Sequence, residues 1–380
     1  MTLPAPAEPG MALADVDTPA LLIDLDAFER NLQRMATLVS RYPGVRLRPH
    51  AKSHKSPIIA LKQMALGAVG ACCQKVSEAE VLVKGGVSDV LIANEIVGRR
   101  KHDRLAALAR EAKVAVCADN AQTIAELNEA AARADVRLSV LVEIECGGKR
   151  CGIAPGKPAA ELAERIAASA NLSFGGLHAY YGTAQHFRAD AERRAAIASA
   201  GECVKDTLAE LGRAGLPCPI VTGAGTGTFE LEAGSGIWNE LQPGSYIFMD
   251  ADYAKNKRAD GAPFDTFEHS LFVLVTVMGT PEKDRAVVDA GHKALGNDAG
   301  FPDIPSLPGA KYHRPSDEHG ALDLTGCQQR PALGDKLLLI PGHCDPTVNL
   351  HDWYIGIRGL HTPDAHVAEV WSVAARGAVF

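Results

Sequence analysis

Residues 45–55 read VRLRPHAKSHK, an alternating run (45–48) that ends in a basic loop. Because alternation predicts a β-strand, Lys52 is expected just beyond a strand end, where barrel enzymes carry their catalytic groups. Positive charge from the neighbouring His50, His54 and Lys55 would favour the neutral amine of Lys52, the form that attacks carbonyl carbons. We therefore predict a Schiff-base lysine at Lys52, with an ordinary surface lysine as the alternative.

The same pattern of a short apolar run and a longer amphipathic stretch recurs from about residue 45 to about residue 250, as in repeated βα units. A helical stretch over 77–84 ends at Gly85-Gly86, which is typical of a C-cap. Asn120 and Asp190 precede further helical runs and are predicted N-caps. Eight strands are predicted, over 45–48, 67–73, 89–93, 114–117, 138–144, 173–179, 219–222 and 245–249.

Eight strands are the number that closes a TIM-type (β/α)8 barrel. A doubly wound open sheet shares the alternation, but polar and glycine-rich segments follow several strands rather than one switch point, which favours the barrel. After about Thr266, β-type runs replace the helical periodicity at 271–277, 286–289, 336–340 and 353–357, which predicts a C-terminal all-β domain. We place the barrel at 26–265 and the β domain at 266–380, with residues 1–25 contributing a strand (20–24) to the β domain.

The composition excludes several classes of partner. A formal net charge of −7 and a pI near 6.0 indicate no basic surface for nucleic acid. No apolar run approaches the roughly 18 residues needed to cross a membrane. Residues 1–10 lack the features of a signal peptide, so a cytoplasmic location is expected. Nine scattered cysteines, an odd number, argue against a disulfide framework.

Candidate ligand-binding groups follow three of the later strands. The loop TGAGTGT (222–228) follows the seventh strand, where glycine N–H groups of a barrel commonly bind phosphate; an ordinary glycine turn is the alternative. Arg150, after the fifth strand, is either a solvated charge or a contact for a ligand's ring or acid group. Tyr180, after the sixth, offers an aromatic face, although packing is the commoner role.

In the β domain, His343 and Asp345 are separated by one residue, so on an extended segment their side chains point the same way. Imidazole plus carboxylate with open positions suits a divalent ion such as Zn or Mn. The spacing is less specific than a four-ligand zinc pattern, and a structural turn is the alternative.

Seven segments, PHAKSHK (49–55), CCQKVSEAE (72–80), RCG (150–152), HAYYG (178–182), GAGTG (223–227), QPGSYIFMD (242–250) and HCDPTVNLHDW (343–353), occur in this order along the chain. Together they resemble the D-threonine aldolase family of the alanine-racemase-like, fold-type III pyridoxal phosphate enzymes. The resemblance extends from residues 17–19 to residues 374–377, nearly the whole chain.

This resemblance implies pyridoxal phosphate linked to Lys52, with Arg150 facing its pyridine nitrogen and Tyr180 flanking it. It implies a divalent metal (Mn, Mg, Co or Zn) on His343 and Asp345. It also implies a homodimer with the active site near the partner's β domain. The other implied cofactor contacts are Gln74, Thr222, Gly223, Gly225, Thr226, Gly227 and Tyr246.

The activity implied is cleavage of a D-3-hydroxy amino acid of the D-threonine or D-allo-threonine type to glycine and an aldehyde. The metal would lower the pKa of the 3-hydroxyl, and His186 is the candidate base. Dehydratase relatives tend to have cysteine at the second metal position, so Asp345 favours an aldolase. β-Hydroxyaspartate aldolase (glycine plus glyoxylate), D-serine dehydratase and D-threo-3-hydroxyaspartate dehydratase stay open. A non-catalytic pyridoxal phosphate binder is the alternative from another class, but such proteins lack a β domain.

Overall fold

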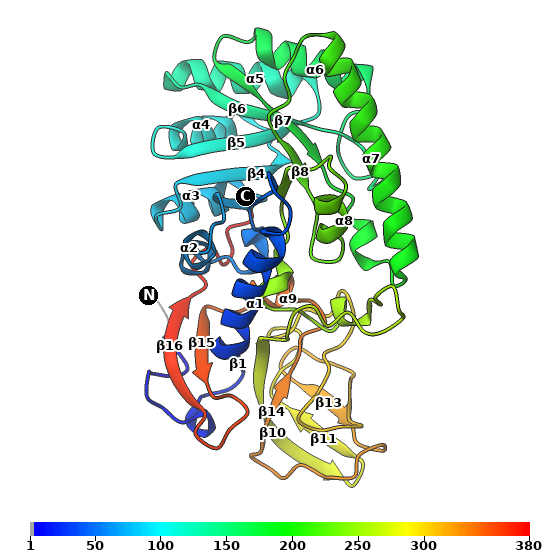
Figure 1. Cartoon of the computed structure of the whole chain (residues 1–380). Helices are drawn as coiled ribbons and strands as arrows, with labels where there is room; N and C mark the ends of the chain where they lie inside the picture. Colours follow the sequence, from blue (N-terminus) through cyan, green and yellow to red (C-terminus); the bar gives the residue numbers. More distant parts are fainter. Residues whose placement is uncertain (1–3) are drawn as a thin grey trace.

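The computed structural model describes residues 4–380 (Figure 1). Eight parallel strands form one sheet in the order β2-β9-β8-β7-β6-β5-β4-β3. Backbone hydrogen bonds of 2.8 Å from Val69 to Leu47 and from Cys72 to Pro49 join the two end strands, so the sheet closes into the predicted barrel. The strands are β2 (Arg46–Leu47), β3 (Ala71–Cys73), β4 (Asp89–Glu95), β5 (Lys113–Ala118), β6 (Leu138–Glu143), β7 (Leu172–Ala179), β8 (Val221–Gly223) and β9 (Glu240–Leu241).

Helices connect these strands and flank them in Figure 1. Helix α3 ends at Lys84, as predicted, and Asn120 caps α5 by accepting a 2.9 Å hydrogen bond from the Thr123 N–H. Asp190 is not the predicted N-cap, because α7 begins at Asp190 itself and its carboxylate accepts from Arg194. The helices are α1 (Leu25–Val39), α2 (Pro57–Ala65), α3 (Val76–Lys84), α4 (Arg99–Leu108), α5 (Ala121–Ala134), α6 (Lys157–Ala168), α7 (Asp190–Arg213) and α8 (Phe229–Gly234).

The predicted eighth strand over 245–249 is wrong. That segment contains the short 3-10 helix η4 (Ser245–Ile247), and the true eighth strand is β9, only two residues long. The apolar run is buried for another reason, since the Phe248 ring packs against Phe28 and Tyr354, with centroids 6.4 and 5.9 Å away. Its hydrophobicity therefore reflects packing against α1 and the C-terminal sheet rather than a place in the barrel.

A buried ion cluster links three barrel strands. Arg48, directly after β2, donates from Nε to Glu240 of β9 at 2.9 Å and from Nη1 to Asp89 of β4 at 2.6 Å. The side chains of Arg48 and Glu240 are 5% and 1% exposed. Burial opposes the guanidinium charge, but the two carboxylates outweigh it and raise the pKa of Arg48. Removing Arg48 would leave the buried Glu240 with only its longer 3.4 Å ion pair to Arg46 Nη2.

The C-terminal region is built from strands in two sheets that share β10, in the orders β14-β10-β1-β15-β16 and β12-β13-β11-β10. As predicted, β1 joins it, pairing antiparallel with β10 and parallel with β15. The predicted runs correspond to β10, β11, β14 and β15, whereas β12, β13 and β16 were not predicted. The strands are β1 (Ala20–Asp24), β10 (Leu271–Glu282), β11 (Arg285–Val288), β12 (Lys311–His313), β13 (Gly320–Asp323), β14 (Lys336–Leu339), β15 (Trp353–Arg358) and β16 (His366–Ser372).

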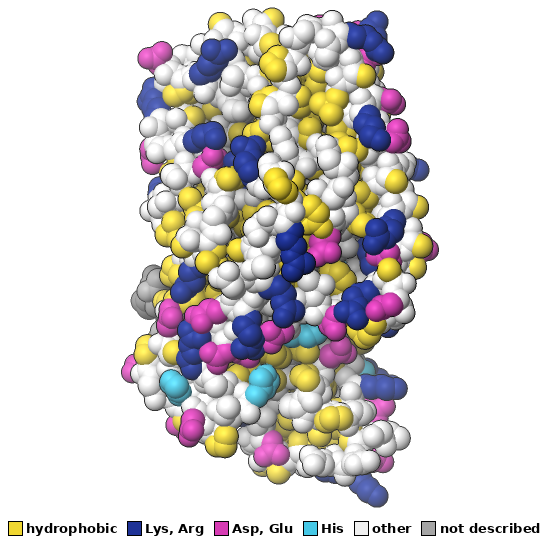
Figure 2. Space-filling model, in the orientation of Figure 1, with side chains coloured by type: hydrophobic (Ala, Val, Ile, Leu, Met, Phe, Trp, Pro, Cys, Tyr) yellow, Lys and Arg dark blue, Asp and Glu magenta, His cyan; other side chains and the backbone are white. Residues whose placement is uncertain are grey.

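Helix α1 connects the two regions. Asp24 ends β1 and caps α1 by accepting hydrogen bonds from the N–H groups of Asp26 and Ala27. Ion pairs extend this junction, among them Arg30–Glu268 and Arg358–Asp26, both 2.8 Å. Figure 2 shows charged side chains of both signs along this junction between the barrel and the C-terminal region. Across residues 4–380, no helix is both long and apolar enough to span a bilayer, and all nine cysteines are free.

Candidate active site

A cavity of about 200 Å³ lies at the carboxyl ends of the barrel strands. Lys52 follows β2, Gln74 follows β3, Tyr180 follows β7, and the glycine loop follows β8. The sequence-predicted residues that line the cavity are Lys52, Gln74, Arg150, Tyr180, Gly225 and Thr226. Seven lining residues were not predicted: His50, His178, Ala224, Gln242, Gly244, Ser245 and Tyr253.

Lys52 lies in the 3-10 helix η2 (Ala51–Ser53), one turn beyond β2, and its side chain is 39% exposed. Its ammonium donates to the Asp345 carboxylate. Burial disfavours the charged amine, but Asp345 outweighs this and raises the pKa of Lys52. The structure thus brings Lys52 and Asp345 together, although they are 293 positions apart in the chain.

The expected charge around Lys52 is wrong. Burial lowers the pKa of His54 to about 3 and holds the pKa of His50 well below its usual range, so both rings are neutral. Lys55 points to Glu78, with Nζ 2.6 Å from Oε1. Positive neighbours therefore do not favour the neutral amine, and the nearest charge to Lys52 is the opposite one on Asp345.

The glycine loop is shaped by close backbone contacts. A Cβ on Gly223 would lie 2.1 Å from the Ala179 carbonyl oxygen, so only glycine allows β7 and β8 to approach this closely. The Gly227 N–H already donates to Gln185, and Thr222 Oγ1 accepts from Gln242. Gly223, Gly227 and Thr222 therefore build the loop without lining the cavity.

Thr226 is the loop residue best suited to an anion. Its hydroxyl is buried without a hydrogen-bond partner, and the residue lines the cavity beside Gly225. A buried hydroxyl left unpaired is costly, and a phosphate oxygen would satisfy it. Tyr246, by contrast, is buried in the core, where its hydroxyl accepts a 3.0 Å hydrogen bond from Gln63.

Arg150 and Tyr180 contact each other at the edge of the cavity. The Arg150 guanidinium is half exposed and lies 5.7 Å from the centroid of the Tyr180 ring, a cation–π arrangement. Its Nη2 also donates to Glu143 at 3.2 Å. A planar ligand in the cavity would therefore meet an aromatic face and a charged donor together.

His343 and Asp345 are not on an extended segment as predicted, because helix α9 (Cys344–Val348) begins between them. His343 Nδ1 lies 2.7 Å from the Asp298 carboxylate, which holds the ring through this nitrogen. Metal-binding histidines are commonly oriented in this way, with the other nitrogen as the ligand. The donor types suit a divalent ion, with the Lys52 ammonium as the competitor for Asp345.

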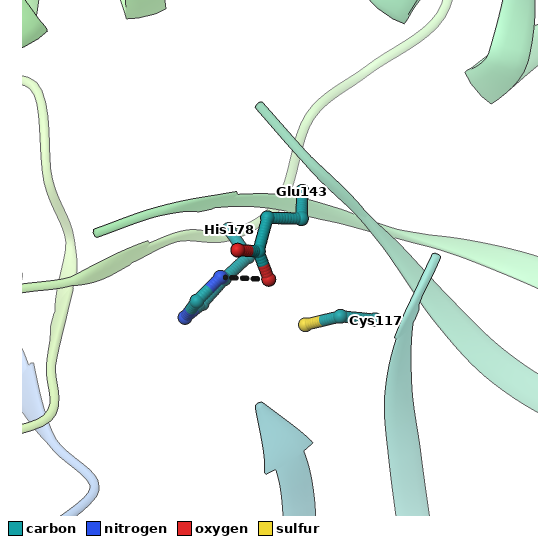
Figure 3. Close-up of side chains that lie close together, drawn as sticks. All are labelled: Cys117, Glu143 and His178. Carbon is teal, nitrogen blue, oxygen red and sulfur yellow. Dashed lines mark hydrogen bonds and ion pairs between the residues drawn. The ribbon is translucent and has the colours of Figure 1, made fainter. Parts of the chain in front are cut away.

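Among residues 4–380, two other groups of side chains could hold a metal ion, and neither includes His343 or Asp345. Glu95, Asp119 and Cys151 form one. Cys117, Glu143 and His178 form the other, which Figure 3 shows. In the second group His178 and Glu143 are already bonded to each other, so their interaction explains the cluster without a metal.

His186, the predicted base, lies outside the cavity lining. It ends the 3-10 helix η3 (Thr183–His186), and its Nδ1 is 2.6 Å from Asp252 Oδ2. Its ring packs on Tyr253, with centroids 5.3 Å apart, and Tyr253 lines the cavity. Nδ1 is thus held by a carboxylate and Nε2 is the nitrogen left for proton transfer.

Comparisons with known proteins show which family the chain resembles. The chain matches the alanine racemase N-terminal domain model over residues 23–252 and the serine dehydratase domain model over residues 270–357. It is 45% identical to the D-threonine aldolase of Arthrobacter sp, over 99% of this chain and 97% of that one. It is also 45% identical to the 3-hydroxy-D-aspartate aldolase of Paracoccus denitrificans (strain Pd 1222), over 98% of this chain and 95% of that one.

A crystal structure of D-threonine aldolase from Filomicrobium marinum has the same fold, with a TM-score of 0.95 at 53% identity, over 99% of this chain and 100% of that chain. The likeness covers both the barrel and the C-terminal sheets. The chain therefore belongs to the D-threonine aldolase family, which consists of carbon–carbon lyases built on the alanine-racemase fold.

Proposed function

We propose that the protein cleaves D-3-hydroxy amino acids to glycine and an aldehyde, with pyridoxal phosphate on Lys52 and a divalent metal on His343 and Asp345. The observation that carries the proposal is the placement of Lys52 in one cavity with the unpaired Thr226 hydroxyl and the Arg150 guanidinium. An amine, a phosphate acceptor site and a ring contact are the three groups that this cofactor requires.

The cofactor, the metal and His186 would have different roles in the cleavage. When bound, the cofactor supplies an electron sink for Cα and the metal supplies positive charge for the substrate's 3-hydroxyl. His186, oriented by Asp252, accepts the hydroxyl proton through Nε2. The C–O bond would become the aldehyde carbonyl as Cα–Cβ breaks, and the proton that His186 takes from the hydroxyl balances the one that Cα gains to give glycine.

Lys52 and Asp345 are coupled in this scheme. The carboxylate that would bind the metal is occupied by the Lys52 ammonium. Attachment of a cofactor to the Lys52 amine removes that competitor, so Asp345 becomes free to bind a cation. We therefore expect metal affinity to be higher after the cofactor has been added than before.

D-Threonine-like substrates are the first candidates, by the relationship to the D-threonine aldolase. The equal identity to the 3-hydroxy-D-aspartate aldolase favours D-3-hydroxyaspartate, cleaved to glycine and glyoxylate, as a second candidate. A dehydratase is disfavoured by Asp345, which stands where the resemblance implies cysteine in dehydratases.

One assay separates these reactions. Metal-loaded holoenzyme is incubated with D-threonine, D-threo-phenylserine, D-3-hydroxyaspartate and D-serine, and glycine and ammonia are measured. We expect glycine plus the matching aldehyde; ammonia without glycine would overturn the aldolase. Lys52→Arg should abolish both the cofactor absorbance band and turnover while keeping the charge beside Asp345.

We also propose a homodimer, on the family resemblance. Each chain has a mass of 40.1 kDa, so light scattering should give about twice this value. A species at the mass of one chain in the concentration range of the assay would contradict the dimer.

A further inference from the structure

The two carboxylate oxygens of Glu143 contact two different side chains, Arg150 and His178. Glu143 ends β6 and is 3% exposed. Its Oε1 accepts from Arg150 Nη2 at 3.2 Å, and its Oε2 lies 2.9 Å from His178 Nδ1, the contact drawn in Figure 3. Arg150 and His178 both line the cavity, so one buried carboxylate orients two of the lining side chains.

Both nitrogens of His178 face acceptors. Beyond the Glu143 contact, His178 Nε2 lies 3.3 Å from Gln242 Oε1. The amide of Gln242 is oriented by its other end, because Nε2 donates to Thr222 Oγ1 at 2.8 Å. A ring with an acceptor at each nitrogen is satisfied only as the imidazolium.

The charges around His178 favour the same state. Burial opposes the imidazolium, but Glu143 outweighs it and raises the pKa of His178. The other titratable groups near it are Arg150, Glu95, Cys117 and His50, together with Tyr180, whose ring centroid is 6.4 Å from that of His178. Burial and the neighbouring Glu143 raise the pKa of Glu95, whereas His178 and Arg150 lower the pKa of Glu143 despite its burial, so Glu143 is the one of the two that stays ionised as the pH falls.

We propose that Glu143 is a positioning residue that holds Arg150 and a cationic His178 in the lining of the cavity, so that two fixed positive charges face the bound cofactor. This inference rests on the proposed function, because it assigns a role toward the same ligand. Tyr180 lies beside both groups, with its ring centroid 5.7 Å from the Arg150 guanidinium and 6.4 Å from the His178 ring, and Gln242 adds the contact at His178 Nε2.

The decisive variant is Glu143→Gln. Glutamine has one acceptor oxygen in place of the two that Arg150 and His178 now use. One of these two donors therefore loses its acceptor and faces the NH2 group instead. The matched control is Glu145→Gln, the same chemical change two residues further on, where the carboxylate accepts from the Gly147 N–H instead. Thermal melting of each apoprotein first establishes that it folds.

The first readout is the protonation of His178 in apoprotein, followed by nitrogen-15 NMR and assigned by the signal that His178→Gln removes. We expect the His178 ring of wild type and Glu145→Gln to stay doubly protonated to a higher pH than a free imidazole, and that of Glu143→Gln to lose its second proton at a lower pH than wild type. A neutral His178 in the wild type near pH 7 overturns the inference, even if Glu143→Gln does not fold.

The second readout is the dissociation constant of pyridoxal phosphate, from the absorbance change on titrating apoprotein. Losing a hydrogen bond between charged groups should raise it about tenfold in Glu143→Gln, with no change in Glu145→Gln. Equal affinity in Glu143→Gln and wild type refutes the positioning role. Wild-type protein that binds no pyridoxal phosphate refutes the proposed function instead, and the NMR result distinguishes the two failures.

Discussion

Replacing Asp345 by asparagine should separate two roles of one carboxylate. Asp345 is the proposed metal ligand and also the ion partner of Lys52. The change should abolish turnover, because a neutral amide is a poor ligand beside a single imidazole. It should at the same time make Lys52 react faster with pyridoxal phosphate, since the attacking species is the neutral amine.

The contacts of Lys52 determine the direction in which its pKa changes when Asp345 is replaced. Burial lowers the pKa of Lys52 and Asp345 raises it, with Asp345 dominant. Without the carboxylate, burial is opposed only by the smaller effects of Tyr180 and Cys344, so the pKa of Lys52 falls and the neutral fraction at a given pH rises. Unit charges about 4 Å apart interact by about 4 kcal/mol at an effective dielectric constant near 20. The 39% exposure of Lys52 screens much of this, so we expect about a tenfold gain in the neutral fraction.

Stopped-flow absorbance of apoprotein mixed with pyridoxal phosphate measures this rate between about pH 6 and pH 9. In the wild type the rate should rise about tenfold per pH unit, because the raised pKa keeps most of the lysine protonated. Asp345→Asn should react about ten times faster at neutral pH. Asp298→Asn, which loses its contact with His343 but none with Lys52, is the control. An equal or slower rate in Asp345→Asn would refute the reasoning.

Three further changes test other parts of the structure. Excess EDTA should abolish cleavage, measured as glycine release, and added Mn²⁺ should restore it; full activity in EDTA would contradict the metal site. Thr226→Val should raise the dissociation constant of pyridoxal phosphate about tenfold by removing the unpaired hydroxyl, and unchanged affinity would remove Thr226 from the phosphate site. Arg48→Met should cost about 3–5 kcal/mol of unfolding free energy in urea because the buried Glu240 keeps only its longer contact with Arg46, whereas Arg30→Met at an exposed pair should cost about 1 kcal/mol or less.

Local patterns predicted most of the barrel and missed the elements that depend on distant partners. Seven strands were found because each is a short apolar run between amphipathic stretches. The eighth, β9, has two residues, one of them the buried Glu240, and its place depends on Arg48 far along the chain. No local pattern could distinguish it from the more apolar segment over 245–249, which is buried between regions instead.

The same limit applies to the site. Position after a strand singled out Lys52, Arg150 and Tyr180 as candidates and the family resemblance added Thr226; all four line one cavity. The charge state of Lys52 could not be predicted, because sequence neighbours suggested cations while the fold buries both histidines as neutral rings. His178 lies in a quoted segment and Glu143 in the predicted strand over 138–144, but their pairing joins β6 to β7 and requires the three-dimensional structure.

The contacts of the lysine loop show why this chemistry needs both regions. Tyr354 of β15 donates to the His54 carbonyl at 2.7 Å, and the Ala375 N–H donates to the Lys55 carbonyl at 2.9 Å. Asp345 reaches Lys52 from α9, beyond β14. The segment that carries Lys52 is therefore held from the C-terminal sheets as much as from the barrel. Because these contacts determine both the position and the charge of the amine, loosening the junction should impair cofactor attachment before it unfolds the barrel.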